Sequence, residues 1–80
     1  MLTRYLREAM RRARYEIIEN GEQFYGEIRG FKGVFAAAAT LEACREQLEE
    51  VLEEWVLFRV SRNLALPKAG RIALHIRKVA

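Results

Sequence analysis

The segment from Gly30 to Arg62 constrains the fold of this chain more than any other part of it. Gly30-Phe31-Lys32-Gly33 predicts a turn, and the apolar run 34–39 predicts a strand, because Gly33 precedes it and Thr40 is a better helix start than any residue within it. After Thr40, apolar residues recur at spacings of three and four: Leu41, Cys44, Leu48, Val51, Trp55 and Phe58, with Leu52 beside them. The pattern predicts an amphipathic main helix over residues 41–60.

The main helix carries six glutamates between Glu42 and Glu54, and most of them project away from the apolar stripe. Such a row is either a solvated face or a surface that attracts a basic partner. Val56, Leu57 and Val60 stray from the stripe, so the last turn is apolar nearly all round. We expect it to be covered by other elements of the same chain, or by a second subunit or a partner protein.

The N-terminal residues predict a helix over residues 3–13, capped by Thr3. Its core side would carry Leu2, Leu6, Ala9 and Ala13, flanked by Tyr5 and Met10. The opposite side would carry a row of arginines at spacings of three, four and three: Arg4, Arg7, Arg11 and Arg14. This row is either a solvated or self-paired face, or a surface that contacts the phosphates of a nucleic acid.

The sequence predicts strands in three further segments. Residues 15–19 are followed by Asn20-Gly21, a pair that accepts the positive φ angles of a hairpin turn, and a second strand runs over residues 23–29. In that strand Phe24, Gly26 and Ile28 alternate with Tyr25, Glu27 and Arg29, which gives one face better suited to burial. Near the C-terminus, Ile72, Leu74 and Ile76 alternate with more polar residues and predict a fourth strand over residues 71–78.

The expected fold class is therefore α+β in a single domain, residues 1–80. A meander of three antiparallel strands over residues 14–39 is joined by the fourth strand, the main helix packs on the sheet, and the N-terminal helix is an addition. Eighty residues are close to the lower limit for one independently stable core, so a second domain is excluded.

The charge is segregated along the chain although the net value is only +3. Acidic residues dominate the middle and basic residues both ends, so the ends can neutralise the centre on folding, and the basic balance is weak evidence for nucleic-acid binding. No apolar run approaches the roughly 18 residues that span a bilayer, and the N-terminus is Arg-rich. We expect a cytoplasmic protein that does not enter a membrane.

The sequence offers no pattern typical of catalysis. Cys44 is the single cysteine, without Cys or His at metal-ligand spacing, and is expected to be buried. His75, the single histidine, falls on the polar side of the last predicted strand, and Ser61 has no evident base. We therefore expect no enzyme activity, no cofactor and no bound metal.

The order of these elements resembles the HicB-like antitoxin family. That family typically shows two strands, an apolar-Pro-Gly-Val-type turn, a short strand, a Thr-Leu-Glu-Glu-Ala-type helix start, a Glu-rich helix with a Trp near its end, and a Leu-Pro segment. The matching stretches are Tyr15-Glu16-Ile17-Ile18, Tyr25-Gly26-Glu27-Ile28, Phe31-Lys32-Gly33-Val34, Thr40-Leu41-Glu42-Ala43, Glu53-Glu54-Trp55 and Leu64-Ala65-Leu66-Pro67. The resemblance covers roughly residues 14–68.

The resemblance implies a partial ribonuclease H-like fold with the last strand beside the first, and an antitoxin role in which a small basic mRNA-cleaving toxin is covered. Three departures stand out: Lys32 replaces the usual proline, the helix over residues 3–13 lies outside the usual pattern, and no DNA-binding module is evident. Ribonuclease activity is not implied, because the chain has no Asp for an acidic metal site.

We therefore expect a homo-oligomer that binds a basic protein through its sheet edge, the acidic surface of the main helix, or both, with nucleic acid not bound directly. The expected interface residues are Glu42, Glu46, Glu49, Glu53, Trp55, Leu57 and Val60. One alternative is a nucleic-acid-binding module that uses Arg4, Arg7, Arg11 and Arg14; another is a structural domain whose only partner is its own copy.

Overall fold

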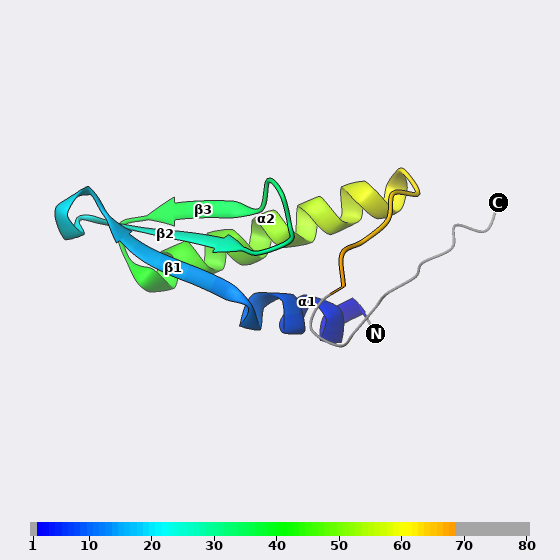
Figure 1. Ribbon diagram of the computed structural model, residues 1–80, viewed down its shortest axis with the longest axis horizontal. Helices are drawn as coiled ribbons and strands as arrows, with labels where there is room; N and C mark the ends of the chain where they lie inside the picture. Colours follow the sequence, from blue (N-terminus) through cyan, green and yellow to red (C-terminus); the bar gives the residue numbers. More distant parts are fainter. Residues whose placement is uncertain (1, 69–80) are drawn as a thin grey trace.

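Two helices and a three-stranded antiparallel sheet form the structure, a computed structural model that describes residues 2–68 (Figure 1). The elements in chain order are α1 (Leu2–Arg11), β1 (Ala13–Ile18), the 3₁₀ turn η1 (Glu19–Gly21), β2 (Gln23–Ile28), β3 (Phe35–Ala38) and α2 (Leu41–Ser61). The α+β class, the meander and both helices are confirmed. The predicted fourth strand over residues 71–78 lies outside the described residues.

The sheet has the strand order β1-β2-β3, as a meander requires. Asn20 and Gly21 take the expected positive φ angles of 57° and 89°, but the connection is longer than a two-residue turn. Ile18 pairs with Gln23, so residues 19–22 all lie in the loop, and η1 occupies most of it. The residue types Asn-Gly therefore predicted the positive φ angles of this loop but not the number of residues in it.

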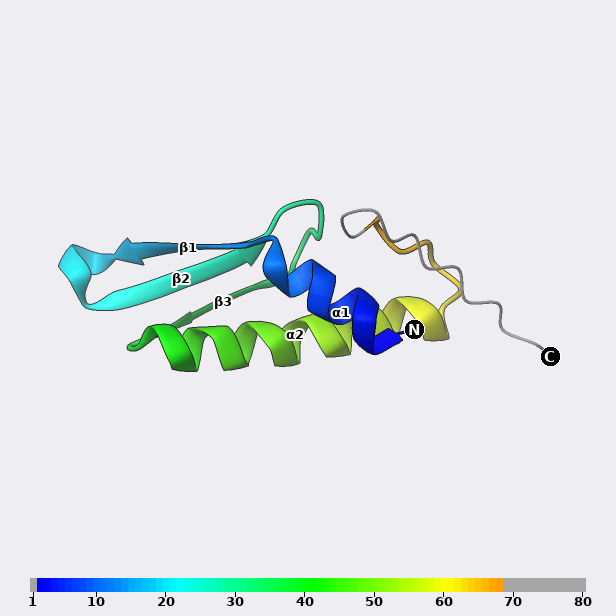
Figure 2. The same cartoon turned by 90° about the horizontal axis from the view of Figure 1, so that it is seen from below.

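The two faces of the sheet differ, as the alternation in β2 predicted. Gly26 and Ile28 are buried, whereas Glu27 between them is exposed. α2 runs along the side of the sheet that carries Gly26 and packs against β3 and β2 (Figure 2). We call the opposite side the outer face; its residues, from the strand register, are Arg14, Glu16, Ile18, Gln23, Tyr25, Glu27, Phe35 and Ala37.

Thr40 caps α2 as predicted, because its Oγ1 accepts a hydrogen bond of 3.1 Å from the backbone N–H of Ala43. The buried row of α2 differs from the predicted stripe. Its members are spaced every four residues: Cys44, Leu48, Leu52 and Val56. Val56, expected outside the stripe, is 1% exposed, whereas Phe58, expected within it, is 54% exposed.

The reason for this difference is geometric. Successive residues are rotated by about 100°, so each step of four residues moves the buried position by about 40° around the helix. Over a helix of 21 residues, a row with this spacing therefore winds around the helix axis. α2 meets a twisted sheet at its beginning and α1 near its end, so the side that must be buried changes along its length. A fixed stripe cannot describe such a helix.

α1 begins at Leu2, so Thr3 lies inside the helix and is not its N-cap. Tyr5 and Ala9 are fully buried, and Leu2, Leu6 and Met10 are partly buried against the same core. The predicted core side is therefore confirmed for Leu2, Leu6 and Ala9, with Tyr5 at its centre rather than at its flank. Ala13 also packs against the core, but it does so from β1, because α1 ends at Arg11.

Three aromatic rings from separate elements connect the two helices, and we call Tyr5, Phe31 and Trp55 the aromatic cluster. The ring of Phe31 lies 6.2 Å from that of Tyr5 and 5.3 Å from that of Trp55, both tilted. Two hydrogen bonds beside the aromatic cluster hold the segment that follows α2. The Tyr5 hydroxyl donates to the Pro67 carbonyl, and Arg59 Nε donates to the Ala65 carbonyl at 2.8 Å.

The last turns of α2 are therefore covered in part by the same chain. Val56 is buried, and Val60 and Leu66 pack against the core. Leu57 and Phe58 remain 60% and 54% exposed. Packing within the chain therefore covers Val56 and part of Val60, whereas Leu57 and Phe58 remain accessible to solvent or to a partner.

We predict that Gly26→Ala destabilises the protein by about 1 to 3 kcal/mol through overpacking. A Cβ at this position would lie 2.9 Å from the ring of Tyr15 and 3.2 Å from the Sγ of Cys44. Urea unfolding followed by circular dichroism measures the change. In a Tyr15→Val background the same substitution should cost clearly less, and an equal cost in both backgrounds would contradict this packing.

We predict that Val56→Ala lowers the free energy of unfolding by about 2 kcal/mol, because it leaves a cavity in the core. Phe58→Ala removes a larger side chain but should cost well under 1 kcal/mol, since more than half of that side chain is exposed. Thermal and urea unfolding of the two variants compare them directly. A larger loss for Phe58→Ala would restore the stripe predicted from the sequence.

Candidate functional site

A row of exposed glutamates follows one side of α2. We call Glu42, Glu46, Glu49 and Glu53 the acidic stripe; they are spaced at four, three and four, and all four are exposed. The same spacing continues through Leu57 and Val60, so helical geometry aligns six of the seven predicted interface residues. Leu57 is exposed, and Val60 is half-buried at the end of the row.

Trp55, the seventh predicted interface residue, lies elsewhere. It is half-buried in the aromatic cluster, and the guanidinium of Arg59 sits 4.8 Å from its ring centre. The indole Nε1 also lies 3.8 Å from the position that a Cβ on Gly33 would occupy. The structure therefore gives Trp55 a role in holding the Gly30–Gly33 turn against α2.

A groove of about 330 Å³ separates α1 from α2. Its lining combines apolar and charged side chains: Thr3, Leu6, Arg7 and Met10 from α1, and Arg45, Glu49 and Glu53 from α2. Arg7 thus shares the groove with two carboxylates of the acidic stripe, while Glu42 and Glu46 do not line it. Sequence patterns did not reveal this groove, because it requires knowing which sides of the two helices meet.

The four arginines of the alternative nucleic-acid surface do not form one row. Arg4, Arg7 and Arg11 are exposed on α1, which ends at Arg11, whereas Arg14 lies in β1. Arg7 lines the groove beside glutamates, and Arg11 lies 3.6 Å from the carboxylate of Glu8. The ion pair of Arg11 and the carboxylates that share the groove with Arg7 fit the self-paired alternative for the row better than a phosphate-binding surface.

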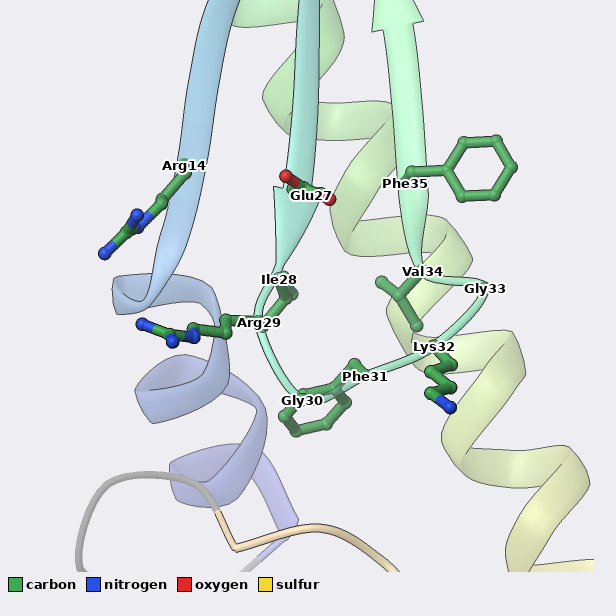
Figure 3. A pocket seen from close by; sticks show the side chains of 10 residues that line it. All are labelled: Arg14, Glu27, Ile28, Arg29, Gly30, Phe31, Lys32, Gly33, Val34 and Phe35. Atoms are coloured by element: carbon green, nitrogen blue, oxygen red, sulfur yellow. The ribbon is translucent and has the colours of Figure 1, made fainter.

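A second hollow, of about 350 Å³, lies at the turn between β2 and β3 (Figure 3). Gly30 and Gly33 have φ angles of 87° and 92° there, which only glycine adopts readily, so the turn can fold tightly over Phe31. Arg14 and Arg29 project on the β1 side of the hollow and Lys32 on the other, with Glu27 between them. The outer-face residues Arg14, Glu27 and Phe35 line part of the hollow, which carries charges of both signs.

A family model described as UPF0150-like matches residues 4–67 of the chain. This chain belongs to the UPF0150-like family, which is related to HicB. The crystal structure of TTHA0281 from Thermus thermophilus is similar, with a TM-score of 0.88 and 44% sequence identity over 96% of this chain and 95% of that one. Among curated proteins, no match is found.

The family match corrects one expectation from the sequence. The resemblance was placed at residues 14–68 with the N-terminal helix outside it, but the match begins at residue 4 and includes most of α1. The structure gives a physical reason, because Tyr5 of α1 packs on Phe31 of the family-like turn and donates a hydrogen bond to Pro67 of the Leu-Pro segment. α1 is part of the core of this domain.

Burial raises the pKa of three titratable side chains that are close to α2 or part of it. It raises the pKa of the Cys44 thiol, which is fully buried and donates to the carbonyl of Ala36 at 3.5 Å. It also raises the pKa of Tyr5 and of Tyr15, and nearby arginines offset these shifts only in part. All three groups are thus held in their neutral form.

Residues 2–68 contain neither a candidate metal site nor a helix that could span a membrane. Within this range, no group of three or more His, Cys, Asp or Glu side chains is placed to hold a metal ion. Neither described helix is long and apolar enough to cross a bilayer.

We predict that the stability of the protein falls as the pH rises through about 9 to 11. Cys44, Tyr5 and Tyr15 have ordinary pKa values of 9.0, 10.0 and 10.0 and higher ones when folded, so the unfolded chain loses these protons first and is favoured at high pH. Below about pH 9 this contribution is fully present.

Urea midpoints measured across this range test the prediction. Tyr15→Phe removes one of the titrating groups and should therefore make the alkaline loss smaller. A midpoint that stays constant or rises with pH would contradict the raised pKa values.

Proposed function

We propose that this chain is a non-enzymatic, cytoplasmic binding module of the antitoxin type, which covers a small basic mRNA-cleaving toxin with one surface of α2. The observation that carries this proposal is the acidic stripe, whose four carboxylates are exposed in a single row. α2 as a whole carries six glutamates and two arginines. Membership of a HicB-related family supports the same assignment.

Such a row suits a basic protein for two physical reasons. Regularly spaced carboxylates attract a cationic surface over a distance and repel acidic competitors, so they set both the association rate and the choice of partner. Leu57 continues the row as an exposed apolar side chain, flanked by Glu53 and Glu54. An apolar contact within an acidic surround favours a partner with the reverse arrangement.

The groove between α1 and α2 adds shape to this surface. Leu6 and Met10 are partly buried there, and Glu49 and Glu53 lie on its other wall. A basic side chain with an apolar stem, such as Arg or Lys, matches that combination, because its stem can lie on the apolar residues while its head meets the carboxylates.

The side chains that could serve as nucleophiles support a binding role over a catalytic one. Cys44 is fully buried and its raised pKa disfavours the reactive thiolate. Ser61 donates its hydroxyl proton to the Phe58 carbonyl at 2.7 Å, as a helix-terminal serine often does.

We predict that a small basic protein is encoded beside this chain in the source genome, and that co-expression of this chain restores growth to a bacterial host that expresses that protein. The purified chain should also inhibit RNA cleavage by that protein. Growth rescue and an RNA cleavage assay measure the two effects. If the neighbouring protein neither cleaves RNA nor binds this chain, the antitoxin assignment is wrong.

Charge-reversal variants of α2 test which of its glutamates contact the basic partner. The double variant Glu46→Lys with Glu53→Lys should weaken binding to the basic partner by about 100-fold, because it replaces two attractive positions of the acidic stripe with repulsive ones. Glu50→Lys with Glu54→Lys makes the same change in net charge on α2 outside the stripe and should weaken binding much less. Isothermal titration at fixed salt compares them, and equal losses would show that only overall charge matters.

A further inference from the structure

The outer face of the sheet presents its side chains in ordered rows across the strands. The register places Arg14, Glu27 and Phe35 in one row, and Glu16, Tyr25 and Ala37 in the next. Phe35 is 56% exposed, and its ring stacks on that of Tyr25 at 6.2 Å. Both described helices leave this side open, since α2 packs on the opposite side of the sheet (Figures 1 and 2).

We propose that the outer face is the interface of a symmetric homodimer, in which two sheets pack face to face about a two-fold axis that runs perpendicular to the strands between these two rows. The proposal concerns a surface different from the acidic stripe and does not depend on the basic partner. It identifies the second copy as the occupant because the face is complementary to itself.

The complementarity follows from the register. A two-fold axis between the rows exchanges one row for the other, so Arg14 meets Glu16 of the second copy, and Phe35 meets Ala37 of the second copy. Every such contact occurs twice. Two ion pairs thus flank a centre in which a large apolar side chain faces a small one, an arrangement that fills space between packed sheets.

Tyr25 meets Glu27 of the second copy under the same operation. A neutral tyrosine hydroxyl donates a hydrogen bond to a carboxylate, so this pair is favourable. Desolvation first, and then the carboxylates of Glu27 and Glu16, raise the pKa of Tyr25, which favours the same neutral form. An axis parallel to the strands would instead oppose Glu27 to its own copy. Like charges at the centre disfavour that alternative.

The same carboxylates distinguish a second copy from other occupants. An aromatic pair on an open sheet with Arg14, Arg29 and Lys32 nearby could suggest stacking of nucleic-acid bases. Glu16 and Glu27 flank Tyr25, however, and would repel the phosphates of a strand that lay across it. For a second copy, these carboxylates are partners for Arg14 and Tyr25.

The face is small, because three short strands contribute it, so the dimer should be weak and depend on protein concentration. Sedimentation velocity of the full chain over a wide concentration range is the direct measurement. We expect monomer at low concentration and dimer at high concentration. A chain that remains monomeric throughout would overturn the proposal.

Charge exchange across the axis provides the sharper test. Arg14→Glu alone and Glu16→Arg alone should each weaken dimerisation by about 10-fold or more, because each creates two pairs of like charges. The double variant restores opposite charges at both positions and should recover the dimer. Failure of the double variant to recover, with its fold intact by circular dichroism, would overturn the proposed axis.

Two control variants separate this interface from others. Arg4→Glu changes a charge on α1 and should leave the dimer unaffected, and Leu57→Ser should do the same because Leu57 lies on α2. A dimer lost on Leu57→Ser would overturn the proposal and move self-association to the end of α2. These measurements use the chain alone, so they distinguish failure of the dimer from failure of the antitoxin assignment.

Discussion

Phe31 is the side chain on which the arrangement of this domain depends. It is 3% exposed and stands between Tyr5 of α1 and Trp55 of α2, so one ring joins a turn of the sheet to both helices. Gly30 and Gly33 allow the chain to fold over it with positive φ angles. The same cluster fixes the segment after α2 through Tyr5 and Arg59. Segments that are far apart in the sequence and typical of HicB-like proteins therefore meet at one point.

The parts of the fold that could be predicted from the sequence are those determined by neighbouring residues. Thr40 marks the start of α2 because its hydroxyl caps the helix locally, and the alternation around Gly26 identifies the buried side of β2. The sequence did not predict that Val56 is buried and Phe58 exposed, because different sides of α2 pack against the sheet and against α1. Arg14 was misplaced for a similar reason, since its spacing continues the helical row although the chain has already entered β1.

The candidate site shows the same division. The acidic stripe is a property of one helix, so its spacing in the sequence survives in the structure. The groove with Arg7 and the rows of the outer face are properties of two or three elements, and neither can be seen before the helices and strands are placed. Trp55 differs from the other predicted interface residues, because its ring packs on Phe31 of the same chain, a contact that the spacing of residues along one helix does not reveal.

The two proposed surfaces lie on different sides of the domain, and this has a consequence for binding. α2 covers one side of the sheet and the dimer would form on the other, so each copy would keep α2, which carries the acidic stripe, on the side away from the axis. A dimer of this kind presents two stripes to a partner. For a partner that is itself dimeric, the second contact becomes intramolecular, and the effective concentration raises the overall affinity without any new contact. Weak self-association would then strengthen partner binding only where both copies are engaged at once, which links the two surfaces through concentration and not through a change in conformation.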